Sequence, residues 1–125
     1  PGRNKPNYAG AHSNLGNAYA AQNKLEDAIR EYNECLRLNP KDPQAYNNRA
    51  NVLAQQNKQQ EAIAHYRTAI ELKSENPEAH FNLGFALAKA GQFAEAEQHY
   101  VEALRQRPGY PQAAEHLQAV RAKLK

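Results

Sequence analysis

Apolar positions in this chain follow the spacing of amphipathic helices, and polar residues fill the positions between them. Between residues 25 and 36 the apolar side chains stand three or four positions apart, so they share one face of a helix. That stripe consists of Leu25, Ala28, Ile29, Tyr32, Cys35 and Leu36. A similar pattern precedes it, and we expect that helix to bury Ala11, Leu15, Ala18 and Tyr19.

The pair of helices recurs along the chain with a period of 34 residues and no insertion. Three units cover residues 9–42, 43–76 and 77–110, and a partial unit follows at residues 111–125. A fixed period of this length is typical of stacked helical repeats, in which each unit buries its apolar face only against its neighbours. The sequence therefore predicts an elongated array.

Equivalent positions of the units carry residues with a clear local role. Proline opens each later unit, where the first N–H of a helix needs no partner. Asn or Gly stands between the two helices of a unit, and both tolerate the left-handed conformation that ends a helix. Small residues recur where two helices must approach closely. These columns are Pro43, Pro77 and Pro111; Asn23, Asn57 and Gly91; and Gly16, Ala50 and Gly84.

The columns resemble the signature of the tetratricopeptide repeat (TPR), Trp-x2-Leu-Gly-x2-Tyr followed by Ala-x3-Phe and Pro. The first unit matches at His12, Leu15, Gly16, Tyr19, Ala28, Tyr32 and Pro40, and the third at His80, Leu83, Gly84, Leu87, Ala96, Tyr100 and Pro108. The second unit departs from the signature at Arg49, Ala50 and Ser74. We expect the Arg49 stem to pack while its charge reaches solvent.

The resemblance covers residues 9–125 and implies an all-α fold. The expected architecture is a right-handed TPR superhelix of three helix-turn-helix repeats plus a C-terminal capping helix over residues 111–125. Residues 1–8 carry no helical pattern, and we expect a disordered N-terminal arm or a cloning remnant there. Cys35 aligns with Ala69 and Ala103, which predicts a small buried filler.

In TPR arrays the first helix of each unit lines the concave side, and here the sector opposite the apolar one is rich in asparagine. Asn14, Asn48 and Asn82 form one column, and Asn17 and Asn51 form a second. An asparagine amide can donate to one backbone group and accept from another, so this row is predicted to bind the main chain of an extended peptide. The pattern resembles the asparagine ladder in the TPR superhelix of O-linked N-acetylglucosamine transferases. The alternative is that these amides only solvate an empty face.

The third unit departs from this amide pattern. Phe81 and Phe85 lie four residues apart on the same sector, and Lys89 follows one turn later. Adjacent aromatic residues on a concave surface are candidate anchors for an apolar side chain, and the lysine favours a partner with some acidic character. The alternative is that the two rings pack against the capping helix. The predicted peptide-binding residues are Asn14, Asn17, Asn48, Asn51, Asn82, Phe81, Phe85 and Lys89.

Co-chaperones that bind chaperone tails form a TPR subclass, and this chain departs from it. Members of that subclass are expected to place two asparagines and several cations around the terminal carboxylate of the chaperone tail. Asn17 and Asn48 match the asparagines, but Ser13, Glu78 and Asn82 stand where the cations belong. Without those cations, a tail that ends in acids gains little charge-assisted hydrogen bonding.

Composition narrows the remaining classes of function. Five histidines and the lone Cys35 show no ligand or nucleophile spacing, and there is no phosphate-binding loop, so we expect no catalysis, metal or cofactor. The net charge of +3 is dispersed among 13 acids, which argues against nucleic acid. No apolar run approaches the ~18 residues of a membrane span.

The expected function is therefore a protein-interaction scaffold that binds an extended peptide or a partner helix. Self-association through the groove or the array ends is the main alternative, and RNA binding is a weaker one. The chain start lacks the apolar core of a signal peptide, which favours a cytoplasmic location and leaves the compartment undetermined.

Overall fold

Residues 8–125 are described by the computed structural model, and they form seven α-helices and no strand. The helices are α1 (Tyr8–Ala21), α2 (Leu25–Leu38), α3 (Pro43–Gln55), α4 (Gln59–Leu72), α5 (Pro77–Lys89), α6 (Phe93–Gln106) and α7 (Pro111–Leu124). They confirm the predicted array of three helix-turn-helix units followed by one more helix. Tyr8 belongs to α1, although the sequence pattern placed it in the predicted arm; the other residues of that arm, 1–7, lie outside the described part.

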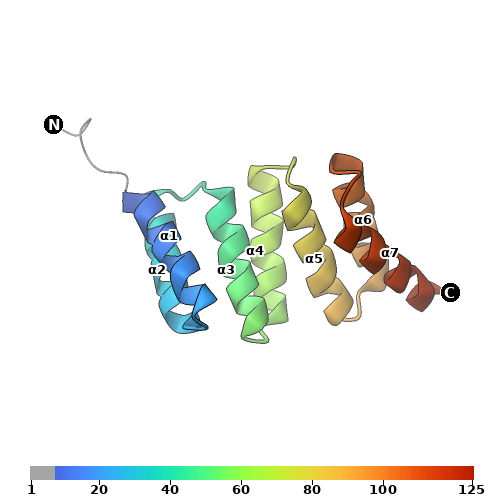
Figure 1. Cartoon of the computed structure of the whole chain (residues 1–125), viewed down its shortest axis with the longest axis horizontal. Coiled ribbons are helices and arrows are strands. Elements are labelled where there is room, and N and C mark those ends of the chain that lie inside the picture. Colours follow the sequence, from blue (N-terminus) through green and yellow to red (C-terminus); the bar gives the residue numbers. More distant parts are fainter. Residues whose placement is uncertain (1–7) are drawn as a thin grey trace.

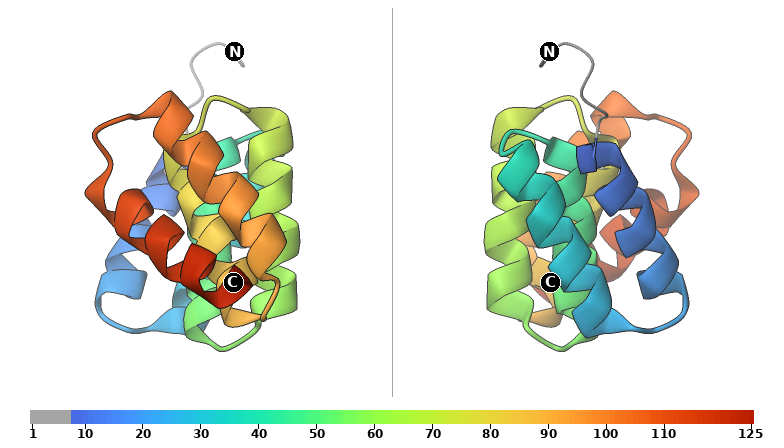
Figure 2. Two further views of the ribbon diagram at one scale, coloured as in Figure 1. Left: turned by 90° about the vertical axis from the view of Figure 1, so that its right-hand side faces the viewer. Right: turned by 90° about the vertical axis from the view of Figure 1, so that its left-hand side faces the viewer.

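The helices stand side by side in chain order and form an elongated stack (Figure 1). Each helix packs mainly on the next one in the chain, and α1, α3, α5 and α7 also contact one another in succession. Seen along the stack, α1 and α7 lie on one side and α4 on the opposite side (Figure 2). The first helices of the units thus form one layer and the second helices another. None of the helices within residues 8–125 has the length and apolar character needed to cross a membrane.

Each unit turns between its two helices in the same way. Asn23, Asn57 and Gly91 adopt φ angles of 62°, 67° and 81°, as the sequence predicted. In the first unit, Asn23 N donates to Ala20 O over 3.0 Å and Lys24 N donates to Tyr19 O over 2.8 Å. This is the Schellman pattern, and equivalent bonds close the turns of the other two units. The identical turns give the units one geometry, so they stack in register.

The helices that open units two and three begin at capped prolines. Asp42 Oδ1 accepts hydrogen bonds from the backbone of Gln44 and Ala45, and Pro43 occupies the first turn of α3. Asn76 caps α5 in the same way through Ala79 N, 3.2 Å away. These side chains satisfy backbone donors that have no partner inside the helix. The caps fix where each first helix begins, and therefore which residues face its neighbours.

Tyr32 and Tyr100, from the second helices of the first and third units, pack on the glycine of the first helix of the same unit. A Cβ atom added to Gly84 would lie 2.8 Å from Tyr100 Cε1, and one added to Gly16 would lie 2.6 Å from Tyr32 Cε1. Glycine therefore allows each ring to lie directly on the first helix of its unit. Cys35 is fully buried (0% exposed), which confirms the predicted small filler.

The first helix of the array is far less buried than predicted. Ala11, Leu15 and Ala18 are exposed, and Leu15 keeps 42% of its surface accessible, although all three were expected to be buried. The equivalent Leu83 in α5 is 0% exposed. The reason is positional, because α4 covers the corresponding face of α5, whereas no helix within the described residues precedes α1.

Arg49 also differs from expectation. Its guanidinium is half-buried between α2 and α4, where Nη1 donates to Asn33 Oδ1 over 2.7 Å and Nη2 lies 3.4 Å from His65 Nδ1. The charge was expected to reach solvent and is only partly exposed, and burial lowers the pKa of the Arg49 guanidinium. The stem does pack, as predicted, and the charged end is held by polar partners on both neighbouring helices.

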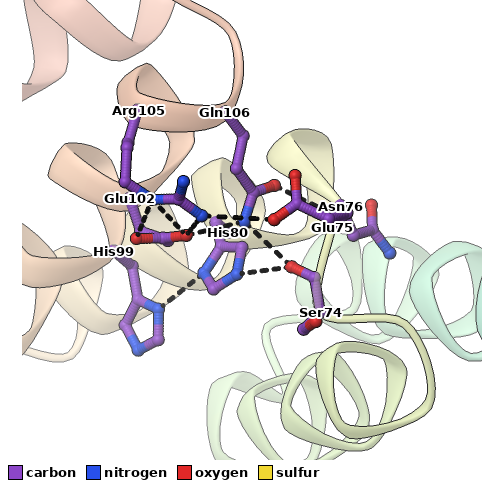
Figure 3. Close-up of polar contacts among 8 residues, drawn as sticks. All are labelled: Ser74, Glu75, Asn76, His80, His99, Glu102, Arg105 and Gln106. Atoms are coloured by element: carbon purple, nitrogen blue, oxygen red, sulfur yellow. Dashed lines mark hydrogen bonds and ion pairs between the residues drawn. The ribbon is translucent and has the colours of Figure 1, made fainter.

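A polar cluster joins the second and third units on the side of the second helices (Figure 3). The rings of His80 and His99 stack with centroids 5.3 Å apart, and their Nδ1 atoms are 3.1 Å apart. Gln106 holds the connection between α4 and α5, because its Nε2 donates to Ser74 O over 2.9 Å and its Oε1 accepts from Asn76 N over 2.7 Å. His80 is only 7% exposed, which confirms that it packs between helices.

Candidate functional site

A row of four hollows follows the layer of first helices, and we call this row the groove. Three of the hollows lie between successive first helices and have volumes of about 270, 310 and 430 Å³. The fourth, of about 210 Å³, lies between α5, α6 and α7. Neighbouring hollows share residues, since Asn51 lines three of them, Asn48 lines two and Phe85 lines two. The groove is therefore continuous along the array.

Seven of the eight predicted site residues line this groove. Asn17, Asn48 and Asn51 surround the hollow between α1 and α3, and Asn82 lies between α3 and α5 with Phe81, Phe85 and Lys89. Asn14 is exposed on α1 and is not among the residues that line these hollows. Of the column formed by Asn14, Asn48 and Asn82, the last two therefore line the groove and the first does not.

The amides of the groove are held by other protein groups rather than standing free. Asn17 Oδ1 accepts from the Tyr32 hydroxyl over 2.5 Å and from Asn48 Nδ2 over 3.2 Å. Asn48 Oδ1 in turn accepts from Gln44 Nε2 over 3.0 Å. The Tyr66 hydroxyl donates to Asn51 Oδ1 in the same way as Tyr32 does to Asn17.

These bonds change what the amides can offer to a ligand. The carbonyl oxygens of Asn17 and Asn51 are already used, whereas their Nδ2 groups have no hydrogen-bond partner within residues 8–125. The sequence predicted amides that donate and accept at once. In the structure these two asparagines present donors, which suit the carbonyl groups of a peptide. Asn82 differs, because its Nδ2 donates to Asn47 Oδ1 over 3.3 Å.

The floor of the groove comes from second helices, and sequence reasoning did not assign it to the site. Tyr32, Tyr66 and Tyr100 each line one of the hollows, and burial raises the pKa of Tyr66 well above its usual value and that of Tyr100 to about 12. The hydroxyls therefore stay protonated near neutral pH, and those of Tyr32 and Tyr66 donate to Asn17 and Asn51. The available signal was the 34-residue period, which places each tyrosine fifteen residues after Asn17, Asn51 or Phe85.

The third unit replaces amides with aromatic rings that meet the capping helix. Phe81 is half-buried, and its ring centroid lies 5.3 Å from that of Tyr110 and 5.1 Å from that of His116. Phe85 also contacts His116, at 5.5 Å, but keeps 42% of its surface accessible. Phe81 thus helps to hold α7, as the alternative interpretation expected, and Phe85 offers an open apolar surface in the groove.

Most arginines of residues 8–125 pair with acids, whereas none of the lysines in this part of the chain does. Arg67 bonds to Glu95 over 2.5 Å, and Arg121 bonds to Glu97 over 2.8 Å. Lys89 and Lys123 line the hollow of about 210 Å³, and neither forms an ion pair within the described residues. Lys89 Nζ lies 5.4 Å from the ring centroid of Phe85. In residues 8–125 no group of three or more His, Cys, Asp or Glu side chains is placed to hold a metal ion.

Comparison with known families gives matches over most of the chain. A family model described as "TPR repeat" matches residues 16–57 and 50–91, and one described as "Tetratricopeptide repeat" matches residues 77–110. No curated protein matches the sequence significantly.

Several solved structures share the fold. The structure described as the first TPR of Spaghetti (RPAP3) bound to the HSP90 peptide SRMEEVD is 25% identical, with a TM-score of 0.91 over 93% of this chain and 92% of that chain. The Sgt2 TPR domain from Aspergillus fumigatus is 19% identical, with a TM-score of 0.89 over 94% of this chain and 79% of that one. MamA is 22% identical, with a TM-score of 0.86 over 94% and 69%, respectively.

Proposed function

This chain belongs to the tetratricopeptide repeat family, and we propose that it is a non-catalytic protein-interaction module that binds an extended peptide or a partner helix in its groove. The observation that carries the proposal is the continuous row of hollows, which is lined by Asn17 and Asn51, whose Nδ2 groups have no hydrogen-bond partner within residues 8–125. Hydrogen bonds to a peptide main chain are largely independent of side-chain sequence, so the groove provides general affinity.

Two details of the binding mode follow from the site. The tyrosine hydroxyls orient Asn17 and Asn51 before a ligand arrives, which lowers the entropy lost on binding. We propose that Asn48 and Asn82 bind the peptide main chain as well, in a ladder that resembles that of the O-linked N-acetylglucosamine transferases. Each net hydrogen bond contributes about 0.5–1.5 kcal/mol, so several are needed for moderate affinity.

The RPAP3 repeat is described as bound to an HSP90 peptide, which supports a peptide ligand for this fold. We propose that this chain binds its ligand differently from a chaperone-tail binder, since Ser13, Glu78 and Asn82 take the places of the cations expected there. Glu78 lines the groove and lies 4.0 Å from Arg107, and its side chain has no donor to offer a terminal carboxylate at that place.

A peptide selection tests this function. Random dodecapeptides would be selected on the wild-type protein, and the affinity of the enriched peptides would be measured by fluorescence polarisation. We expect Asn17→Ala/Asn51→Ala and Asn48→Ala/Asn82→Ala each to weaken binding about tenfold, with an unchanged helical circular dichroism signal, since each pair removes two amides from the groove. Phe85→Ala should weaken it more than either single asparagine variant.

Gln60→Ala/Gln98→Ala is the matched control, because it removes two exposed amides from α4 and α6, away from the groove. This variant should bind as the wild type does. Equal affinity of both asparagine double variants and the wild type would place the binding surface elsewhere on the array.

Self-association is a second candidate function, and the exposed face of α1 favours it. Tyr8 and Leu15 are 58% and 42% exposed on a helix that carries no Asp, Glu, Lys or Arg. Light scattering over a concentration series separates the two functions, because a peptide-binding monomer keeps a constant mass.

A further inference from the structure

We propose that the hollow between α5, α6 and α7, called here the anchor pocket, binds an apolar side chain that has a carboxylate beside it. Its walls include Phe85, Phe93, Tyr100, Ala119 and Val120, and its mouth carries Lys89 and Lys123. The inference rests on the proposed peptide-binding function and names the chemical class of the ligand. The groove would supply general affinity for the main chain of a peptide, and the anchor pocket would set the position of the peptide along the groove.

The walls of the anchor pocket are apolar and firmly held. Tyr100 and Val120 are 1% and 3% exposed, so they cannot turn away to close the space of about 210 Å³. His116 is fixed by Nδ1 at 2.8 Å from Gln112 O and by its contacts with the two phenylalanine rings. A pre-formed apolar pocket beside a polar groove suits one apolar side chain of an extended peptide.

The two lysines define which peptides fit. The cation beside them on α7, Arg121, is paired with Glu97 over 2.8 Å. Lys89 and Lys123 have no such partner within residues 8–125, and they stand on helices α5 and α7 at the same pocket. A ligand carboxylate between two unpaired ammonium groups would gain charge-assisted hydrogen bonds. The pocket therefore selects an apolar residue next to an acid.

The repeat pattern points to the same place. In the third unit, Phe85 occupies the position that Asn17 and Asn51 occupy in the first two units. Lys89 likewise occupies the position of Ala21 and Gln55. The amide pattern thus ends where the anchor pocket begins. Phe85 and Lys89 line both the pocket and the neighbouring hollow with Asn51 and Asn82. A peptide held at those asparagines can therefore place its next side chains in the pocket.

Titration of the 15N-labelled protein with synthetic heptapeptides tests the proposal. The first probe has a leucine between two aspartates in a glycine–serine frame, with blocked ends. Two comparison peptides replace the aspartates with asparagines or the leucine with glycine. A fourth ends in leucine with a free carboxylate, which separates a terminal carboxylate from a side-chain one. We expect the first probe to shift the amide signals of Lys89, Ala119 and Val120, with about fivefold weaker binding for the asparagine peptide.

Variants of the protein sharpen the test. Lys89→Gln/Lys123→Gln should weaken the binding of the first probe about fivefold. The control, Lys24→Gln/Lys58→Gln, removes the same charge from two exposed turns and should leave the binding unchanged. Ala119→Leu keeps both lysines and fills the pocket with a larger side chain at an exposed position of α7. It should therefore abolish the shifts of the amide signals without loss of helicity.

Two results would overturn the anchor pocket: equal weakening by both lysine pairs, or shifts confined to Asn17, Asn48 and Asn51. The second result would leave the proposed groove intact. If the groove is wrong and the pocket is right, Asn48→Ala/Asn82→Ala will leave the shifts of Lys89 and Val120 unchanged.

Discussion

Two histidines from α5 and α6 are packed against each other where the second unit meets the third. His80 and His99 stack, and Nε2 of His99 lies 3.6 Å from Glu95 Oε2, which also bonds to Arg67. Burial lowers the pKa of both histidines below the ordinary value of 6.5. Each ring also opposes the protonation of the other through like charge. The charged groups that face the pair are Glu75, Glu95, Glu102, Arg67 and Arg105.

This pair predicts that the protein becomes less stable in mild acid. Below pH 6.5 both His80 and His99 bind protons in the unfolded chain, whereas burial disfavours their protonation in the folded protein. The free energy of unfolding should therefore be constant above about pH 7.5 and fall as the pH drops below 6.5. Urea unfolding followed by circular dichroism at pH 7.5 and 5.5 measures this change. His80→Gln/His99→Gln should reduce the difference between the two pH values, and equal stability of the wild type at both would contradict the prediction.

At the scale of the helices, the turns carry most of the local information in the sequence. Each turn inside a unit needs one residue with positive φ, and Asn23, Asn57 and Gly91 provide it. Proline and a capping Asp42 or Asn76 then fix where the next unit begins. Local rules of this kind depend on few neighbours, which explains why the helix pairs and their turns were predictable from the chain alone.

The Gly91 turn gives a matched set of variants. A Cβ atom at Gly91 meets nothing within 4 Å, so Gly91→Ala would cause only backbone strain at a φ of 81°. We expect a loss of about 1–2 kcal/mol in the free energy of unfolding, measured by urea denaturation. Gly91→Asn should cost less, because asparagine already occupies this place in the first two units. Gly109→Ala is the control, since that site is open and lacks a positive φ; a comparable loss there would show that the strain argument is wrong.

At the scale of the whole molecule, the sequence predicted the stack but not the surroundings of each position in it. The period correctly placed Asn17, Asn48, Asn51 and Asn82 along one groove. It did not show that the hydroxyls of Tyr32 and Tyr66 use the carbonyls of two of them, because such bonds depend on the distance between helices. A column of equivalent residues also assumes equivalent neighbours, and the ends of an array break that assumption. Leu15 shows this, since it matches Leu83 in pattern but not in burial.

That difference predicts unequal effects of the same substitution in the two units. Leu83→Ala should cost about 3 kcal/mol in the free energy of unfolding, because it leaves a cavity in a fully buried site, and Leu15→Ala should cost less than about 1 kcal/mol. Chemical denaturation of both variants measures the two values, and hydrogen exchange should show the amides of α1 opening before those of α5. If both substitutions cost the same at every protein concentration, the stability of the array does not follow its packing. If Leu15→Ala becomes costly only at high concentration, a second molecule covers α1.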